Sequence, residues 1–216
     1  MPARSTPART AGRAGRPTAE RAEAIDRAIL AAGKDLFLSV GFSATLMEAV
    51  AAAAGVSKGA LYARYPTKDA LLQAVVADRL AVWSEEARAR EGPLPDEPRA
   101  RLALLTWSLQ RSLASDEIQA FTRILAQGAD AGGQLMRDVY EGGYMAGVRS
   151  LRDSILHAAK ESPSPPRDAT RVAEMLMAMM IGWRQATGLI RPISEDEAKA
   201  YAEHAVDVVL GGRAAW

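Results

Sequence analysis

The chain has 216 residues, of which 49% are hydrophobic, and this is enough apolar material for two packed domains. It contains no cysteine, which excludes disulfides, thiolate metal sites and cysteine redox chemistry and is typical of proteins in a reducing cytoplasm. The net charge is only +1, but residues 1–70 hold ten Lys or Arg against six Asp or Glu, whereas the remainder holds 17 against 20. The first part therefore carries +4 and the second part −3, which favours contact between the first part and phosphates.

Residues 1–19 form an arm with four arginines, no acidic residue and no hydrophobic periodicity. We expect this arm to be disordered when it is free. Arg16, between Gly15 and Pro17, is of the kind that enters a narrow A·T minor groove. Two alternatives stay open, namely a merely solvated tail and a transit peptide, although the arm lacks the apolar face of a transit peptide.

Residues 18–40 are predicted to form the first helix, because apolar side chains recur three or four residues apart and give one buried stripe. The stripe consists of Ile25, Ile29, Ala32, Leu36 and Val40. This helix is expected to support the segment that follows it.

Residues 45–68, TLMEAVAAAAGVSKGALYARYPTK, indicate two short helices joined by a tight glycine turn, which is the pattern of a helix-turn-helix. Thr45 and Glu48 have the spacing of a capping box that starts the first helix, and Gly55 ends it. Ser57 is predicted to cap the second helix, and Pro66 follows its end.

The second short helix has one inward and one outward face. Leu61 and Tyr65 lie four residues apart and are expected to face inward. Gly59 and Ala63 point the opposite way, with Tyr62 to one side. Leu61 and Tyr65 are therefore interpreted as core residues.

A fourth helix is predicted from Lys68 to about Arg90, with inward apolar residues and with Asp69, Asp78 and Arg79 outward. Its inward positions are Leu71, Leu72, Val75, Val76, Leu80 and Trp83. Residues 92–95, Gly-Pro-Leu-Pro, end this helix and form the linker. The remainder is helical by pattern and shows no strand signal, with helices predicted over 97–114, 116–126, 133–160, 167–190 and 194–210.

The run GVSKGALYARYPTKDAL, preceded by a long amphipathic helix and by Gly41-Phe42, resembles the DNA-binding domain of the tetracycline-repressor (TetR) family over about residues 20–75. The resemblance implies an all-α fold with a three-helix helix-turn-helix domain and a larger helical domain for ligand binding and dimerisation. The corresponding divisions are the disordered arm (1–19), the DNA-binding domain (20–67), a connecting helix (68–91) and the second domain (92–216).

The resemblance also implies roles on double-stranded operator DNA. Phosphate contacts would come from a hydroxyl, two ammonium groups and a phenol, those of Thr45, Lys58, Lys68 and Tyr62. Base reading would come from small side chains and one arginine, namely Ser57, Gly59, Ala60, Ala63 and Arg64, with Arg64 suited to guanine. The alternatives are that Thr45 is only a cap, that the two lysines are ordinary solvated charges, and that Tyr62 packs against the first helix.

The last two predicted helices carry more apolar surface than one neighbour covers. The helix over 167–190 has Val172, Met175, Met179, Trp183 and Ala186 on one stripe and Met177 and Ile181 on another. The final helix offers Tyr201, Ala202, Ala205, Val206, Val209 and Leu210. The resemblance implies that these two helices form a homodimer interface.

Ligand-binding candidates in the second domain are chosen by chemistry, because large, adaptable or aromatic side chains suit a hydrophobic or aromatic inducer. They are Trp107, Phe121, Met136, Tyr140, Tyr144, Met145, Met175, Met179 and Trp183, with Gln110, Arg123 or Gln185 as orienting polar groups. The alternative for each is a plain core residue. Two glycine pairs, 132–133 and 142–143, permit a kink beside Tyr140 and Tyr144.

Other classes of function find no support in the sequence. The two histidines, His157 and His204, have no neighbouring metal ligand, and no catalytic or phosphate-binding motif occurs, so we expect neither an enzyme nor a bound metal or cofactor. The longest apolar run, residues 175–183, is too short to cross a membrane. We therefore expect a cytoplasmic repressor released from its operator by a small molecule. A regulator gated by a protein partner, or one that acts without a ligand, stays open, as does activation instead of repression.

Overall fold

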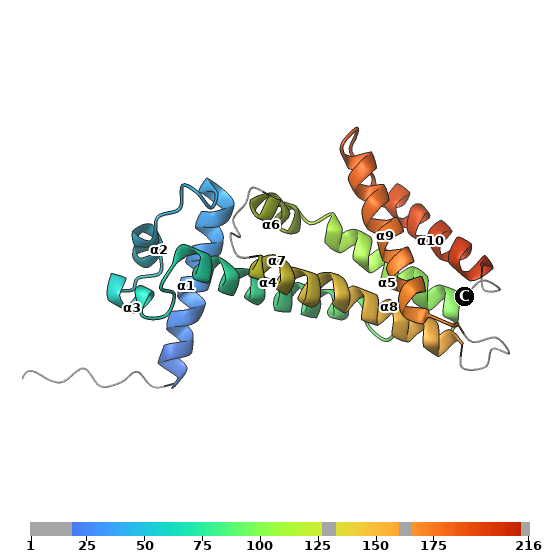
Figure 1. Ribbon diagram of the computed structural model, residues 1–216, viewed down its shortest axis with the longest axis horizontal. Coiled ribbons are helices and arrows are strands. Elements are labelled where there is room, and N and C mark those ends of the chain that lie inside the picture. The colour runs from blue at the N-terminus through green and yellow to red at the C-terminus, as the bar shows by residue number, and fades with distance from the viewer. Residues whose placement is uncertain (1–18, 127–132, 160–165, 213–216) are drawn as a thin grey trace, which may run out of the picture.

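The computed structural model describes residues 19–126, 133–159 and 166–212, and the regular elements within these ranges are all helical (Figure 1). In chain order they are α1 (Ala19–Val40), α2 (Met47–Ala53), α3 (Lys58–Tyr62), α4 (Lys68–Glu91), α5 (Pro98–Leu113), α6 (Asp116–Ala126), α7 (Gln134–Val139), the π-helical turn η1 (Tyr140–Tyr144), α8 (Met145–Ala158), α9 (Ala169–Gly188) and α10 (Glu195–Gly211). The all-α prediction is confirmed. The predicted arm lies outside the described residues, except Ala19, which begins α1.

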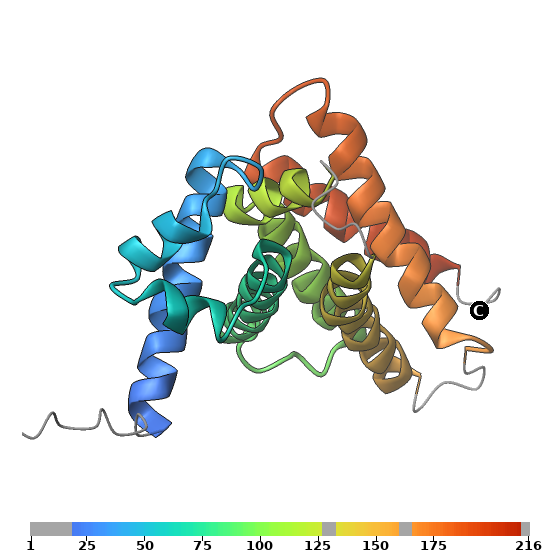
Figure 2. The ribbon, with the colours of Figure 1, turned by 60° about the vertical axis from the view of Figure 1, so that its left-hand side comes forward.

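The helices are arranged along one long axis. Helices α1, α2 and α3 form a lobe at one end, and α4 runs from this lobe into the rest of the molecule, where it contacts α5, α7 and η1 (Figure 1). Helices α9 and α10 lie together at the other end, and Figure 2 shows the same separation from a second side. The predicted domain divisions stay a prediction. One apolar core, described next, contains residues from both sides of the predicted boundaries.

The first core cluster joins the lobe to α4. Leu61 of α3 is fully buried in it, and α1 and α4 contribute Ile29, Ala32, Phe37, Leu71, Leu72, Val75 and Val76. Gly33 permits the close approach of these two helices, because an added Cβ would lie 3.3 Å from Val75 Cγ2. Phe121 and Ile124 of α6 complete the same cluster, so α6 touches the core of the lobe.

The prediction that the buried stripe of α1 extends to Val40 is wrong. Val40 is exposed because α1 ends there, and Gly41, with φ of +85°, begins the turn that follows. The fully buried position in the last turns is Phe37 instead.

The predicted capping box is also wrong. Helix α2 begins at Met47 after Leu46, and no side chain caps it. The hydroxyl of Thr45 instead donates to the Gly41 carbonyl at 2.7 Å, which secures the turn before α2. The predicted cap of α3 is confirmed, because Ser57 Oγ accepts a hydrogen bond from the Ala60 amide at 3.1 Å.

The second core cluster is built from α5, α8, α9 and α10. Its buried members include Leu102, Leu105, Val148, Leu151, Ile155, Leu176, Met177, Met180, Ala202, Ala205 and Val206. Ala202, Ala205 and Val206 were expected to face a second copy, but they are buried within the chain, where α10 packs on α5. The surface of α10 that remains for a partner is therefore a different one.

The single helix predicted over 133–160 is interrupted. It consists of α7, η1 and α8, and the π turn contains Gly142 and Gly143. These two glycines lie against Leu80 of α4, where an added Cβ would meet the leucine methyl groups at 3.3 and 3.4 Å. The irregular backbone predicted for this glycine pair is confirmed, and the pair permits close contact with α4. Gly132 lies outside the described residues.

Candidate DNA-binding surface and ligand cavity

Helix α3 is held by its inner face and leaves its outer face free. Leu61 has 0% exposure and anchors the helix in the first core cluster. Tyr65, just after the helix, is half-buried, and burial together with the neighbouring Asp26 raises the pKa of its phenol. The helix is thereby fixed by packing and by its Ser57 cap, so its outer side chains have a defined direction.

The outer face of α3 combines small side chains with one cation and one phenol. Lys58, Gly59, Tyr62 and Ala63 are exposed, as is the cap residue Ser57. Ala60 is half-buried. A Cβ added at Gly59 would meet no other atom within 4 Å, so a DNA backbone or base edge can approach this side closely. A short helix with this surface has the geometry of a recognition helix.

Lys68 has more partners than an ordinary solvated lysine. Its ammonium donates to the Ser43 and Thr45 carbonyls, both at 3.1 Å, and lies 4.6 Å from the centroid of the Phe42 ring. It therefore fastens the turn before α2 to the start of α4. Thr45 is 2% exposed, so its hydroxyl faces the interior. Any phosphate contact at these two positions stays a prediction, and their visible role is to shape the turn.

Two further positively charged groups of the surface are paired with acids. Arg64 Nε lies 2.8 Å from Asp26 Oδ1 of α1, and Arg64 Nη1 donates to the Ala60 carbonyl at 3.3 Å. A guanine base would therefore compete with the Asp26 carboxylate for the Arg64 guanidinium. Asp26 was not among the residues predicted from the sequence. Lys58 Nζ lies 3.6 Å from Glu48 Oε1, but this pair is well exposed and costs little to open.

A cavity of about 700 Å³ lies between the end of α5, helix α6 and the second half of α9. Its walls combine apolar side chains, uncharged polar groups and arginines. They are formed by Leu113, Ala114, Ile118, Gln119, Thr122, Arg123, Ile181, Arg184, Gln185, Gly188, Leu189, Arg191, Pro192 and Ile193. Two of the predicted orienting groups, Arg123 and Gln185, are among them.

None of the nine predicted ligand-binding residues lines this cavity. Trp107 lines a smaller neighbouring cavity of about 240 Å³, together with Gln110. Met136, Tyr140 and Met175 are exposed, whereas Tyr144, Met145, Met179 and Trp183 are half-buried. Tyr140 stacks on Tyr144 at 5.2 Å between ring centroids, and Trp183 stacks on Tyr201 at 4.2 Å. Residue type alone therefore did not locate the cavity.

Phe121, predicted to contact a ligand, lies in the core instead of on the wall of this cavity, and its contact with a ligand stays a prediction. Its ring is 2% exposed and stacks edge-on against Trp83 in the first core cluster, with 5.8 Å between centroids. Helix α6 turns Phe121 toward the lobe and its opposite face, with Gln119 and Arg123, toward the cavity.

Arg184 is the functional candidate that the sequence analysis did not select. Its Nε donates to Gln110 Oε1 at 2.6 Å, and Gln110, which is fully buried, donates through Nε2 to the Met180 carbonyl at 3.1 Å. Burial lowers the pKa of the Arg184 guanidinium, although an arginine in a protein remains protonated. The sequence held one indication of this role, because Arg184 is a charged residue directly after the longest apolar run.

Two family models match the chain in succession. Residues 29–75 match the bacterial regulatory proteins of the tetR family, and residues 100–212 match the C-terminal domain of AefR-like transcriptional repressors. The second match alone covers more than half of the chain. The chain belongs to the TetR family. It is thus a DNA-binding transcriptional regulator, and the helix-turn-helix recognised in the sequence lies within the first matched segment.

Relatives of this TetR-family chain support the assignment. The transcriptional regulator RutR of Escherichia coli K12 is 29% identical over 165 residues, which cover 74% of this chain and 76% of RutR. The structure of the flavonoid-responsive regulator FrrA is 27% identical, covers 87% of this chain and 96% of its own, and superposes with a TM-score of 0.66. A regulator from Mesorhizobium loti assigned to the TetR family, at 23% identity, shares the fold with a TM-score of 0.76 and covers 88% of this chain and 97% of its own.

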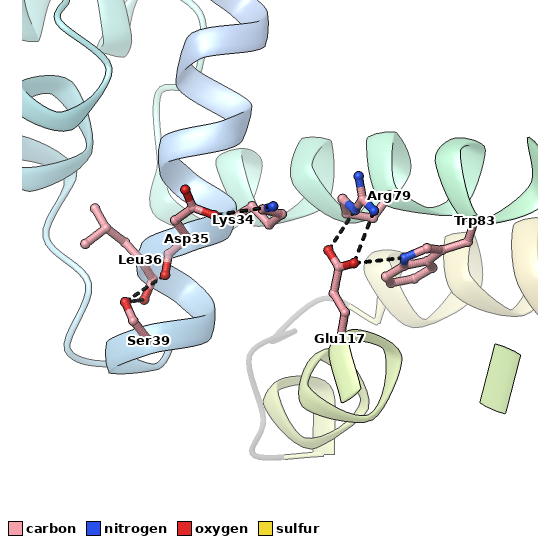
Figure 3. Close-up of polar contacts among 7 residues, drawn as sticks. All are labelled: Lys34, Asp35, Leu36, Ser39, Arg79, Trp83 and Glu117. Atoms are coloured by element: carbon pink, nitrogen blue, oxygen red, sulfur yellow. Dashed lines mark hydrogen bonds and ion pairs between the residues drawn. The ribbon is translucent and has the colours of Figure 1, made fainter. Parts of the chain in front are cut away.

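In this TetR-family chain, one polar cluster links α6 to the connecting helix α4. Arg79 Nε lies 2.8 Å from Glu117 Oε1, and Trp83 Nε1 donates to Glu117 Oε2 at 3.3 Å (Figure 3). The prediction that Arg79 points outward is wrong, because its side chain is only 16% exposed. Glu117 belongs to the same helix as the cavity residues Ile118 and Thr122, so one helix touches both the cavity and α4.

Within the described ranges, no helix is both long and apolar enough to span a bilayer. The same ranges contain no cluster of three or more His, Cys, Asp or Glu side chains placed to hold a metal ion. The relatives named above are transcriptional regulators.

Proposed function

We propose that this TetR-family chain is a cytoplasmic homodimeric repressor whose two α3 helices bind a pseudo-palindromic operator, and that a hydrophobic or aromatic small molecule releases it. The observation that carries the DNA-binding part is the outer face of α3, where Lys58, Gly59 and Tyr62 are exposed on a helix anchored by the fully buried Leu61. Phosphate contacts by Lys58 and Tyr62 would position the helix, and Ala60, Ala63 and Arg64 would face the bases.

An exposed stripe on the last two helices supports the homodimer. On α9 the exposed positions Met175, Ala178, Gly182 and Ala186 recur on one side, and exposed Leu189 follows the helix on the same side. On α10 the exposed positions Ala200, His204 and Val208 also share one side. The small residues would let the helices of two copies approach closely, while Met175, Leu189 and Val208 would contribute apolar area. A dimer of this kind places two recognition helices on one DNA duplex.

Release by a small molecule is supported by the cavity of about 700 Å³, which has the size of an ordinary small-molecule site. The structural relative FrrA is described as flavonoid-responsive, which is consistent with an aromatic inducer. Gating by a protein partner and action without a ligand are the competing functions, and a core without a cavity would have favoured them.

The coupling between inducer and DNA would pass through α4. Helix α6 reaches α4 through Glu117, and η1 reaches it where Gly142 and Gly143 meet Leu80. A ligand that moves α6 or η1 would shift α4 and change the distance between the two α3 helices from the roughly 34–36 Å that one DNA turn requires. Crystal structures of free and ligand-bound dimers with equal distances between the α3 helices would contradict this mechanism.

A Tyr62→Phe variant tests the DNA-binding surface. Removal of the phenolic hydroxyl would cost one hydrogen bond to a charged phosphate in each half-site, so operator affinity should fall by about 10- to 100-fold. The measurement is a mobility shift on a fragment upstream of the gene. Tyr140→Phe is the matched control, because Tyr140 is similarly exposed (49% against 40%) and lies on η1, away from α3. Equal affinities of the two variants would contradict the role of Tyr62.

A further inference from the structure

The charged side chains that line the cavity between α5, α6 and α9 are all positive. Its fourteen lining residues, all of them in the described ranges, include three arginines and no Asp or Glu. Arg191 is already satisfied, because both of its terminal nitrogens donate to the Glu197 carboxylate. Arg123 and Arg184 have no ion pair with a described residue. The cavity therefore holds two cations that a ligand can neutralise.

Arg184 is oriented before any ligand arrives. Gln110 accepts from its Nε at 2.6 Å and is itself fixed by its bond to the Met180 carbonyl. Because Gln110 occupies only the Nε, the two terminal nitrogens of the guanidinium remain for a planar bidentate partner. The smaller cavity beside it contains one acid, Glu195, which is not within ion-pair distance of Arg184.

The rest of the wall is suited to an apolar body. Leu113, Ile118, Ile181 and Ile193 supply aliphatic surface. Gln119 supplies an uncharged amide and Thr122 a hydroxyl, and each already donates to a backbone carbonyl of the protein. A purely inorganic anion would leave this aliphatic surface unused, whereas a neutral apolar ligand would leave the arginines unpaired. The combination favours one anionic group on an otherwise apolar molecule.

We infer that this cavity binds a monocarboxylate with an apolar body, whose carboxylate pairs with Arg184 and Arg123 and whose body lies against the aliphatic wall. This inference names the chemical class of the inducer in the proposed function. Only the step from ligand binding to operator release rests on the proposed function. Arg184 is the principal specificity residue, because Gln110 holds its guanidinium in place, and Arg123 adds a second charge from α6.

The test is isothermal titration calorimetry of the full-length protein with two carboxylates, 2-naphthoate and decanoate, with their neutral primary amides, and with inorganic phosphate. At least one carboxylate should bind, and it should bind about 10-fold or more tightly than its amide, because only the anion satisfies the two arginines. Comparison of 2-naphthoate with decanoate shows whether the cavity prefers an aromatic or an aliphatic body. No binding by either carboxylate, equal affinity of acid and amide, or tighter binding of inorganic phosphate would each overturn the inference.

Variants locate the binding site. Arg184→Gln should lose about 10-fold or more in carboxylate affinity and keep the amide affinity, whereas Arg171→Gln, an exposed arginine on the same helix, should behave as wild type. Because Arg184→Gln also changes the partner of buried Gln110, Arg123→Gln is the second variant. Arg123 is exposed, so its loss spares the fold, and carboxylate affinity should fall several-fold. Wild-type carboxylate affinity in both variants would overturn the inference.

A parallel mobility shift separates the two proposals. Carboxylate binding without operator release would support the cavity inference and contradict its use as the inducer site. Operator release by an uncharged compound, with no carboxylate binding, would support release by a small molecule and contradict the carboxylate site.

Discussion

A Gly182→Arg variant is expected to be a folded monomer whose operator affinity is lower by about 100-fold or more, because a monomer contacts only one half-site. Gly182 lies in the middle of the exposed stripe on α9, between Ala178 and Ala186. An added Cβ there meets nothing within 4 Å, so the arginine is accommodated within one chain. Replacement of a helical glycine also favours the helix by about 1 kcal/mol. The only contact that the arginine should disturb is the one to a second copy.

Analytical ultracentrifugation and a mobility shift on the same samples measure this result. Ala89→Arg is the control, because it adds the same charge at an exposed position of α4 outside the stripe, and it should remain dimeric and bind DNA as wild type does. A Gly182→Arg protein that stays dimeric at micromolar concentration would contradict the proposed interface, and a monomer with wild-type affinity would contradict the two-half-site operator.

Leu61→Ala should lower the free energy of unfolding by about 2–5 kcal/mol and abolish specific DNA binding, because it leaves a void under the recognition helix. Leu61 is fully buried and is the only residue that the short helix α3 buries. Its loss therefore removes both packing energy and the fixed direction of Lys58 and Tyr62. Denaturant titration followed by circular dichroism measures the stability change.

Leu156→Ala is the matched control for this substitution. Leu156 lies on the exposed side of α8, so truncation there should change stability by less than about 0.5 kcal/mol. Equal stability loss in the two variants, or a Leu61→Ala protein that binds the operator as wild type does, would contradict the anchoring role of Leu61.

Local patterns predicted most of the fold. The periodicity of apolar residues placed α1, α4 and α6 close to their observed bounds, and Ser57 was recognisable as a cap because its spacing to the first amides of α3 is local. The glycine pair 142–143 indicated irregular backbone for the same reason.

What the sequence did not show depends on contacts between distant residues. Thr45 has a capping-box spacing, yet its hydroxyl is bound to Gly41, and Arg79 resembles a solvated charge until Glu117, 38 positions later, is placed beside it. The cavity between α5, α6 and α9 was not predicted because large apolar side chains mostly fill cores, as Phe121 does. The residues that line the cavity come together only when α6 and α9 are both placed against α5.

Footprinting of the full-length protein on its own upstream region tests whether α3 of each copy reads one half of a two-fold operator. We expect a protected pseudo-palindrome whose half-site centres lie about one helical turn apart, or a multiple of it. Protection should weaken at both half-sites together in Tyr62→Phe and be retained in Tyr140→Phe. Uniform protection without sequence preference, or a pattern that Tyr62→Phe leaves unchanged, would show that the two α3 helices do not read the operator.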